Sequence, residues 1–167
     1  DYLDAGALHL CPLDLSAQLQ FSDSLRGAMR VLTLDPSAAT MKPSNLREVR
    51  GLVHGLTAFL PSLEEITALF WGETLDPWEM AAAIGEWGCE YVVIKCGVRG
   101  QLLFDAHSQR RWEIPAYPAR LADPTGAGDA FCGGFLAGYR KNYNALEGAL
   151  CGNVSASLAV EGSGPFH

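Results

Sequence analysis

The sequence predicts an α/β fold in which helices cover both faces of a mostly parallel sheet, forming a three-layer α/β/α sandwich. Short apolar runs rich in β-branched residues alternate along the chain with segments whose apolar residues recur at helical spacing. This alternation is typical of βαβ units, whose crossover helices bury a parallel sheet. No linker, internal repeat or low-complexity stretch interrupts the sequence, so we expect residues 1–167 to form a single α/β domain.

Five short segments are predicted as strands. Each is largely apolar, and the segment 91–94 is the clearest because it is β-branched and uninterrupted. Proline or glycine follows several of these segments, as expected where a strand ends in a turn. The predicted strands are residues 7–11, 31–34, 59–60, 91–94 and 101–104.

Five longer segments are predicted as helices. The strongest start signal is Asp76-Pro77-Trp78-Glu79, which places an acid at the N-cap, proline at the first helical position and glutamate at the capping-box position. In a parallel sheet the loops after the strands carry the ligand-binding groups, so we expect the site there. The predicted helices are residues 16–29, 45–56, 76–87, 127–140 and 145–160.

Composition narrows the classes of partner. The formal net charge is −7 and no segment concentrates lysine and arginine, which argues against nucleic acid as a partner. No stretch has the length and apolarity of a membrane span, and the first residues lack the basic region of a signal peptide. The five cysteines form no Cys-x-x-Cys pair, and the four histidines show no metal-ligand spacing. We therefore expect a reduced, cytoplasmic protein without a nucleic-acid or membrane partner.

The most informative segment is a glycine-rich turn at residues 123–135, Asp-Pro-Thr-Gly-Ala-Gly-Asp-Ala-Phe-Cys-Gly-Gly-Phe. Gly126 and Gly128 allow a sharp turn and let a ligand approach the backbone closely. A helical pattern follows, and its first amides lack carbonyl partners and are locally positive, which suits an anion. Asp129 lies inside this turn. It either stabilises the helix start or acts as a base beside a bound anion, and the turn alone leaves both readings open.

The whole string resembles the C-terminal signature of the ribokinase-type (PfkB) carbohydrate kinases. Further segments resemble that family in the same order along the chain. The family's N-terminal part, with its lid and most sugar contacts, has no counterpart here, so the resemblance implies a fragment that carries the ATP-binding and catalytic portion. The segments that carry the wider resemblance are residues 34–36, 59–65, 92–100 and 151–154.

The resemblance implies an ATP-dependent kinase that transfers the γ-phosphoryl group to a hydroxyl of a sugar or sugar derivative, with Mg²⁺ as a cofactor. By similarity, Asp129 is the catalytic base. The amides of Gly126, Ala127 and Gly128 are expected to stabilise charge on the transferring phosphoryl group. Such a role suits phosphoryl transfer, which needs positioning and electrostatic stabilisation more than covalent chemistry.

The resemblance also implies a nucleotide site along the strand and glycine turn at residues 92–100. Lys95, Gly97 and Gly100 are expected to border the nucleotide, and Asn153 to meet the adenine edge. For Lys95 a plain surface charge is the alternative, and for Asn153 a solvent-facing helix position.

Metal sites are implied at two places. Glu65 is expected to hold magnesium-bound water, with a solvated helix-start acid as the alternative; nearby Ser62 departs from the family's asparagine. Asp123 and Thr125 resemble the start of a monovalent-cation loop for an ion such as K⁺, completed near Gly162–Gly164, with a plain turn as the alternative.

Two other functions remain open. A nucleoside kinase of the same fold is one, because the residues that choose the acceptor lie in the missing half. A non-catalytic nucleotide- or sugar-binding relative is the other, although the intact Gly126, Gly128 and Asp129 argue against it. A dinucleotide-binding domain is excluded because no Gly-x-Gly-x-x-Gly follows the first strand. The expected partners are a sugar-like small molecule and, through the lid, a second copy of the protein.

Overall fold

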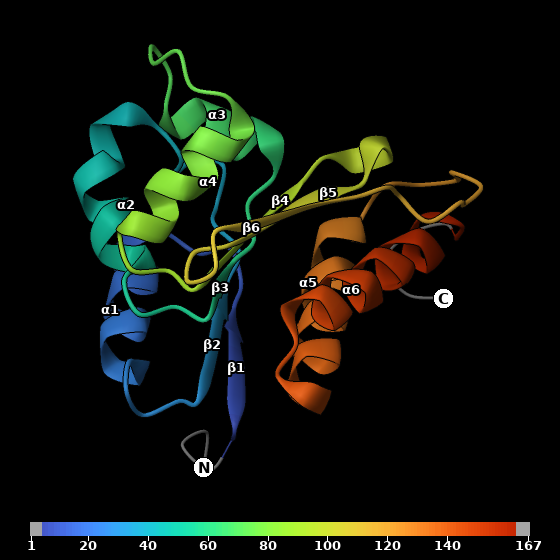
Figure 1. The fold of residues 1–167 in the computed structure, drawn as a ribbon, viewed down its shortest axis with the longest axis horizontal. Helices are drawn as coiled ribbons and strands as arrows, with labels where there is room; N and C mark the ends of the chain where they lie inside the picture. The colour runs from blue at the N-terminus through green and yellow to red at the C-terminus, as the bar shows by residue number, and fades with distance from the viewer. Residues whose placement is uncertain (1–4, 163–167) are drawn as a thin grey trace.

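The computed structural model describes residues 5–162, which form one six-stranded sheet with helices on both faces (Figure 1). The strands lie across the sheet in chain order. The first four run parallel, and the last two join antiparallel. The strands are β1 (Ala7–Leu10), β2 (Val31–Leu34), β3 (Ala58–Phe59), β4 (Tyr91–Lys95), β5 (Gln101–Asp105) and β6 (Arg110–Ile114).

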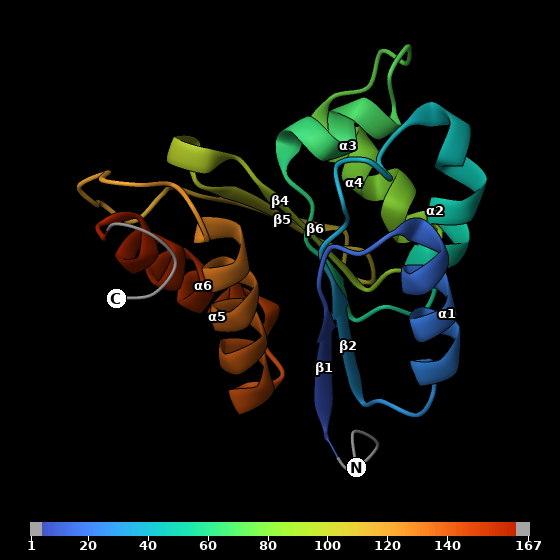
Figure 2. The same cartoon turned by 180° about the vertical axis from the view of Figure 1, so that it is seen from behind.

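Helices cover the sheet in two separate groups. Four helices follow β1, β2 and β3 and pack on one face, whereas the last two pack on the other (Figures 1 and 2). The predicted three-layer sandwich with a mostly parallel sheet is confirmed. None of the helices described is long and apolar enough to cross a membrane. The helices are α1 (Leu15–Leu25), α2 (Leu46–Val53), α3 (Leu63–Leu69), α4 (Pro77–Glu86), α5 (Ala127–Asn142) and α6 (Ala145–Val160), with 3₁₀ turns at Pro43–Asn45 and Gly97–Arg99.

Side-chain alternation along the strands divides the core into two layers. On β3, Phe59 packs toward α1–α4 while Ala58 packs toward α5 and α6. On β4, Val92 and Ile94 face the first group and Val93 faces the second. All five side chains are fully buried. A strand buried on both faces is apolar at every position, which explains the continuous apolar run in the sequence of β4.

α5 and α6 form a closely packed pair because glycines lie at their contact. A Cβ on Gly138 would lie 2.7 Å from the Cβ of Cys151 on α6. A Cβ on Gly152 would lie 2.8 Å from the carbonyl oxygen of Phe131 on α5. Side chains at these positions would push the helices apart, so the glycines help to fix the direction in which α5 begins.

Two predicted helices are shorter than the sequence pattern suggests. The helix predicted at 16–29 ends at Leu25, and the chain then turns at Gly27 with φ 79°. The helix predicted at 45–56 ends at Val53, shortly before Gly55 with φ 75°. Left-handed glycines commonly follow helix ends, and the apolar spacing beyond them belongs to the next buried segment.

α3 and β6 are not among the elements predicted from the sequence. β6 is mostly polar and exposed because it is the outer strand beside β5, so it lacks an apolar signal. α3 has only seven residues, and a capping box formed by Ser62 and Glu65 sets its start. Both elements depend on neighbours that a local pattern does not reveal.

Candidate active site

α5 begins at the glycine-rich turn that the sequence analysis singles out. Gly126 is the N-cap and takes left-handed angles, φ 81° and ψ −1°, which glycine adopts without strain. Ala127, Gly128 and Asp129 form the first turn of this 16-residue helix. The Ala127 amide donates a long bond of 3.2 Å to the carbonyl of Pro124, so it is already engaged within the turn. The helix dipole nevertheless makes the start of α5 locally positive, and this suits an anion.

The Asp129 side chain is exposed at this helix start. Among residues 5–162, no group donates a hydrogen bond to its carboxylate. Burial, followed by the charge of Lys95, lowers the pKa of His9 on β1 to about 4, and the charge of Asp129 partly opposes this fall. Asp129 therefore lies within electrostatic reach of the carboxyl end of β1, and His9 is neutral at pH 7. A carboxylate in this position is able to accept a proton.

A buried ion pair lies beneath the start of α5. Lys95, the last residue of β4, places its Nζ 2.7 Å from Oδ2 of Asp35, which directly follows β2. The side chains of Lys95 and Asp35 are only 16% and 8% exposed. A Cβ on Gly128 would lie 3.7 Å from the Lys95 Nζ, so the ammonium sits against the first turn of α5. The surface-charge alternative for Lys95 is therefore wrong.

Two further side chains complete the surroundings of this ion pair. The Cys132 Sγ of α5 lies 3.6 Å from the Asp35 carboxylate and 4.0 Å from the Lys95 Nζ. His9 Nδ1 lies 2.9 Å from Thr33 Oγ1 on β2. Burial raises the pKa of Asp35, and the neighbouring ammonium opposes that rise. The carboxyl ends of β1, β2 and β4 thus bring polar groups together under the helix start.

Glu65 lies at the same edge of the sheet, and one of its carboxylate oxygens already accepts a hydrogen bond. Its Oε2 accepts a hydrogen bond of 2.7 Å from the Ser62 amide, and Ser62 Oγ accepts one of 3.2 Å from the Glu65 amide. The backbone of Ser62 also forms an isolated parallel β-bridge with that of Lys95. No group of three or more His, Cys, Asp or Glu side chains gathers as metal ligands in the part of the chain described. Mg²⁺ bound beside phosphates needs only one or two carboxylates, and the capping box leaves Oε1 of Glu65 available, so the residues fit that ion.

The predicted monovalent-cation loop has the geometry of an ordinary Asx turn. The Thr125 amide donates to Oδ1 of Asp123 at 2.9 Å, and the Asp123 amide donates to the carbonyl of Val160 at 3.2 Å. Gly162 is at the end of the described residues, and Gly164 lies outside them. The cation site stays a prediction.

A largely apolar pocket of about 430 Å³ opens beside the start of α5. Ala127 and Pro124, at the start of α5, line this pocket, and so does Val98 of the Gly97–Arg99 turn. Gly100 shapes this region because a Cβ there would collide with backbone atoms near Ile114, and its φ is 94°. The pocket and the positive helix start are therefore neighbours. A ligand that carries an anion on an apolar group needs two such neighbouring sites.

Asn153 faces this pocket from α6 but its carboxamide is already bonded. Its Oδ1 accepts from the Tyr117 amide at 2.9 Å, and its Nδ2 donates to the Pro115 carbonyl at 2.7 Å. Asn153 is 9% exposed, so the solvent-facing alternative is wrong. Its contact with an adenine edge stays a prediction, and the clear structural role is to hold the segment at residues 115–117.

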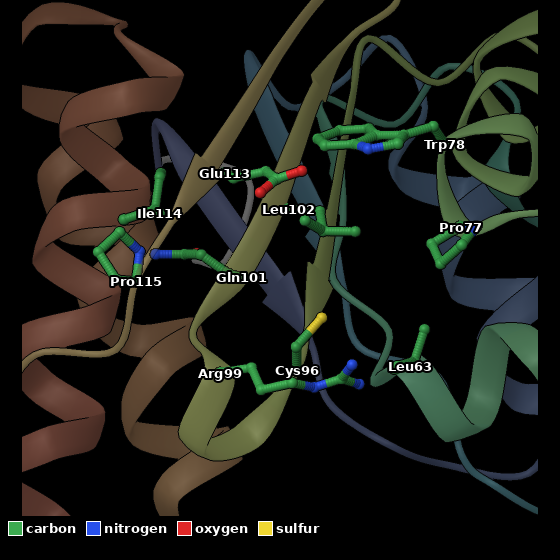
Figure 3. A pocket seen from close by; sticks show the side chains of 10 residues that line it. All are labelled: Leu63, Pro77, Trp78, Cys96, Arg99, Gln101, Leu102, Glu113, Ile114 and Pro115. Carbon is green, nitrogen blue, oxygen red and sulfur yellow. The ribbon is translucent and has the colours of Figure 1, made fainter.

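A second hollow, about 470 Å³ in volume, lies between β5 and β6 and the helices α3 and α4. Figure 3 shows Trp78 and Pro77 on one side of it and Glu113 and Gln101 on the other. None of the residues predicted for the site lines this hollow. The start of α5 is the better candidate for the active site.

The structure brings Lys95 against the α5 turn, and Gly97 and Asn153 line the pocket that also contacts Ala127 of that turn. His9, Cys132 and Asp35 are not among the site residues predicted from the sequence, although their side chains lie in or around the buried ion pair. Their shared signal is position, because His9 and Asp35 lie at or just beyond the carboxyl ends of parallel strands. Many residues lie at strand ends, so this position identifies His9 and Asp35 as site residues only once the location of α5 is known.

Comparison with known sequences identifies one family and several relatives. The family described as "pfkB family carbohydrate kinase" matches residues 9–166. A cytidine kinase of Thermococcus kodakarensis is 31% identical over 141 residues, covering 84% of this chain and 50% of that protein. An uncharacterised sugar kinase of Archaeoglobus fulgidus is 30% identical over 145 residues, covering 83% of this chain and 56% of that protein. The chain thus spans about half the length of these relatives.

Solved structures share the fold at lower identity. An adenosine kinase of Anopheles gambiae in complex with P1,P4-di(adenosine-5) tetraphosphate has a TM-score of 0.82 at 22% identity, covering 98% of this chain and 53% of that one. A putative ribokinase II of E. coli in complex with ATP and Mg²⁺ has a TM-score of 0.76 at 22% identity, covering 97% of this chain and 54% of that one. These likenesses show the ribokinase-like fold over nearly the whole chain.

Proposed function

The chain belongs to the PfkB family of carbohydrate kinases, and from this premise we propose that it is the ATP-binding and catalytic part of an ATP-dependent kinase. The kinase transfers the γ-phosphoryl group to a hydroxyl of a small molecule. The observation that carries the proposal is the start of α5, where Asp129 stands beside a positive backbone turn over the carboxyl ends of parallel strands. That arrangement supplies a base and an anion site at one point.

In this proposal Asp129 is the general base. As the acceptor oxygen attacks the γ-phosphorus, its proton passes to the Asp129 carboxylate; the new O–P bond forms and the bond to the β-phosphate oxygen breaks, releasing ADP. The exposed carboxylate, without a hydrogen-bond donor among residues 5–162, supports this role. General-base catalysis of this kind contributes about 10²–10⁴-fold to the rate.

The backbone turn at Gly126–Gly128 and the ammonium of Lys95 stabilise the transferring phosphoryl group. Gly126 and Gly128 lie at a helix start, where the peptide dipoles favour negative charge. Lys95 lies against the same turn and is held there by Asp35. Glu65 would hold Mg²⁺ through its Oε1 or through a bound water, and the ion would neutralise phosphate charge when bound.

The donor base occupies the apolar pocket between Val98 and α6. The lining of this pocket includes Ala127, so a base bound there has its phosphates directed at the start of α5. The complex of ATP and Mg²⁺ with the putative ribokinase II supports ATP as the donor. We extend this assignment to Gly97 and Gly100, whose turn forms the pocket wall.

The acceptor we propose is a sugar or sugar derivative. The family description and the uncharacterised sugar kinase of A. fulgidus support it. A nucleoside is the second candidate, favoured by the likeness to the cytidine kinase of T. kodakarensis over 84% of this chain. Both acceptors present a hydroxyl to Asp129, so the chemistry of the transfer is the same.

A screen of a full-length protein containing this chain tests the proposal. ADP formation from ATP and Mg²⁺ is measured with sugars, sugar acids and nucleosides, using wild type and Asp129→Asn. We expect acceptor-dependent ADP formation with one class of acceptor, and its loss in the variant. A wild-type protein that binds ATP but forms no phosphorylated product with any class would support the non-catalytic alternative.

A further inference from the structure

A third pocket, about 560 Å³ in volume, lies where the ends of α1, α2 and α4 meet. Arg26, Arg47 and Arg50 line it, and Glu86 is the one acid among the described residues of its lining. We refer to it as the arginine pocket. From its charge and its free donors we infer that the arginine pocket is a second anion site, which binds a small organic molecule that carries phosphate groups.

The arginine pocket lies at the opposite end of the parallel strands from the candidate active site. His54 follows α2 and precedes β3, and Trp87 and Gly88 follow α4 and precede β4, so these lining residues lie near the amino ends of the strands. α1, α2 and α4 share one face of the sheet, and α5 packs on the other (Figure 1). The inference therefore goes beyond the proposed function and does not rest on it.

The charge of the arginine pocket differs in sign from that of the chain as a whole. The chain contains 12 lysines and arginines and has a formal net charge of −7. Three of these 12 residues line the arginine pocket, and together with Glu86 they give the lining a formal charge of +2, with His54 counted as neutral. A local excess of positive charge on an acidic protein attracts small anions.

Two of the three arginines have no partner within residues 5–162. Arg47 and Arg50 form neither an ion pair nor a side-chain hydrogen bond there, and they lie three residues apart on α2, where side chains are neighbours. Arg26 is held in place, because its Nη2 donates to the carbonyl of Gly51 at 3.0 Å and its Nη1 lies 3.2 Å from Oδ1 of Asp23. One fixed guanidinium and two free ones thus line the same pocket.

Arginines near helix C-termini often bind the last carbonyls of the helix, and α2 and α4 both end at this pocket. Here those carbonyls have other donors. The carbonyl of Val53 accepts from the Leu56 amide at 3.2 Å, and the carbonyl of Trp87 accepts from Nδ1 of His54 at 3.1 Å. Helix capping therefore does not account for the two free arginines.

The ligand class follows from the donors and the size of the pocket. A guanidinium offers parallel N–H donors that match two oxygens of one phosphate, and it does not lose its charge. A volume of about 560 Å³ is typical of small-molecule sites, so it has space for an organic group beside the phosphates. Trp87 lines this space and is stacked on Phe70 with ring centroids 5.7 Å apart, which gives the pocket a rigid wall.

Calorimetric titration of a full-length protein containing this chain with inorganic pyrophosphate, without Mg²⁺ and at low salt, tests the inference. We expect the wild type to show a binding event that the double variant Arg47→Gln/Arg50→Gln weakens at least about tenfold, because hydrogen bonds to charged groups are lost. Arg110→Gln, which removes an exposed arginine of β6, is the matched control and should leave that event unchanged. Arg47→Gln alone carries the same test if the double variant fails to fold.

Two outcomes would overturn the inference. One is pyrophosphate binding that the double variant leaves unchanged, since the anion would then lie elsewhere, as at the start of α5. The other is a wild type that does not bind pyrophosphate. If that wild type still binds ATP, the proposed function stands while the second anion site fails.

Glu86→Gln tests the same inference with the opposite sign. Removing this carboxylate should strengthen pyrophosphate binding about two- to fivefold, because it relieves an exposed repulsion. Added NaCl should weaken binding to the wild type, since salt screens exposed charges. Weaker binding by Glu86→Gln would overturn the inference, because the pocket would then recognise a cation or a positively charged group.

Discussion

Asp129 occupies a position that serves two different purposes in proteins. Its place in the first turn of α5 stabilises the helix, and its exposed carboxylate is open to an acceptor hydroxyl. Replacing it with asparagine separates these roles, because asparagine is nearly isosteric and removes only the charge and the basicity. We expect Asp129→Asn to fold and to bind ATP normally, while kcat of the full-length protein falls about 10²–10⁴-fold. Parallel measurements of kcat, melting temperature and ATP affinity check this.

Asp76 provides a matched control, since it caps α4 and does not line the pocket beside α5. Asp76→Asn should leave kcat unchanged. If Asp129→Asn folds, binds ATP and keeps more than about a tenth of the wild-type kcat, Asp129 is a helix-stabilising acid and another group is the base.

The ion pair of Lys95 and Asp35 leads to a prediction about stability. Truncating one partner of a buried pair leaves the other charge uncompensated, which costs about 3–5 kcal/mol. Lys95→Met should therefore lower the free energy of unfolding by about 3 kcal/mol, and adding Asp35→Asn should recover part of that loss. Denaturant unfolding of the two single variants and the double variant measures this coupling.

The partly exposed pair of Arg26 and Asp23, with side chains 31% and 68% exposed and nitrogen and oxygen 3.2 Å apart, is the control for that cycle. Asp23→Asn should change stability by less than about 1 kcal/mol, because solvent screens such pairs. An effect of Lys95→Met no larger than that of Asp23→Asn would show that the pair of Lys95 and Asp35 adds nothing beyond a surface contact.

The residue scale also shows where a sequence is informative. The roles proposed for Gly126 and Asp129 come from neighbouring residues in one turn, so a local string is sufficient to propose them. The pairing of Lys95 with Asp35 joins residues 60 positions apart. Each residue looks like an ordinary charge at a strand end until the sheet brings β2 and β4 to the same edge.

At the scale of elements, α3 shows how a short helix is tied to the site. Its capping box joins Ser62 to Glu65 through Oε2, and the proposed magnesium role of Glu65 uses Oε1. Glu65→Gln keeps a capping-box partner, because glutamine is accepted at that position, but removes the charge. We expect Glu65→Gln to raise the Mg²⁺ concentration needed for half-maximal rate without a large loss of stability.

Ser62→Ala is the complementary variant, because it removes the cap and keeps the carboxylate. It should cost about 0.5–2 kcal/mol of stability and leave the magnesium dependence nearly unchanged. A magnesium titration in which Ser62→Ala shifts the midpoint more than Glu65→Gln does would exclude Glu65 as the magnesium residue.

Elements differ in how far their own sequence determines them. β4 is buried on both faces and α4 carries an N-cap acid, a proline and a capping box, so both follow from local signals. β6 is polar because it lies at the edge of the sheet, and it exists through its pairing with β5. α3 is too short for a periodic pattern. The elements that escape prediction are those whose stability comes from a neighbour.

At the scale of the molecule, the two helical layers have different functions. α1–α4 bury one face of the sheet, whose strands lie in chain order. α5 and α6 lie on the other face, and their close contact aims the start of α5 at the carboxyl ends of those strands. In the proposed function, the phosphate site and the base pocket therefore both lie beside the start of α5, and the Asp129 side chain there is exposed to solvent.

That openness leads to the last prediction. When the catalytic base is exposed, water competes with the acceptor hydroxyl for the phosphoryl group. Kinases exclude water by closing a lid or a domain over the substrates. The chain spans about half the length of the relatives it matches. From the family resemblance we expect the lid and most acceptor contacts to lie outside these residues. We expect the 167-residue chain to bind ATP with an affinity within about tenfold of that of a full-length protein, because the proposed pocket and helix start both lie within these residues. We expect the kcat of the chain to be less than about a hundredth of the full-length value, because a loss of acceptor positioning alone is enough to cause such a fall. Calorimetric titration with ATP and a coupled ADP assay on both proteins measure the two quantities. Turnover of the isolated chain close to that of the full-length protein would mean that these residues hold the acceptor as well as the donor.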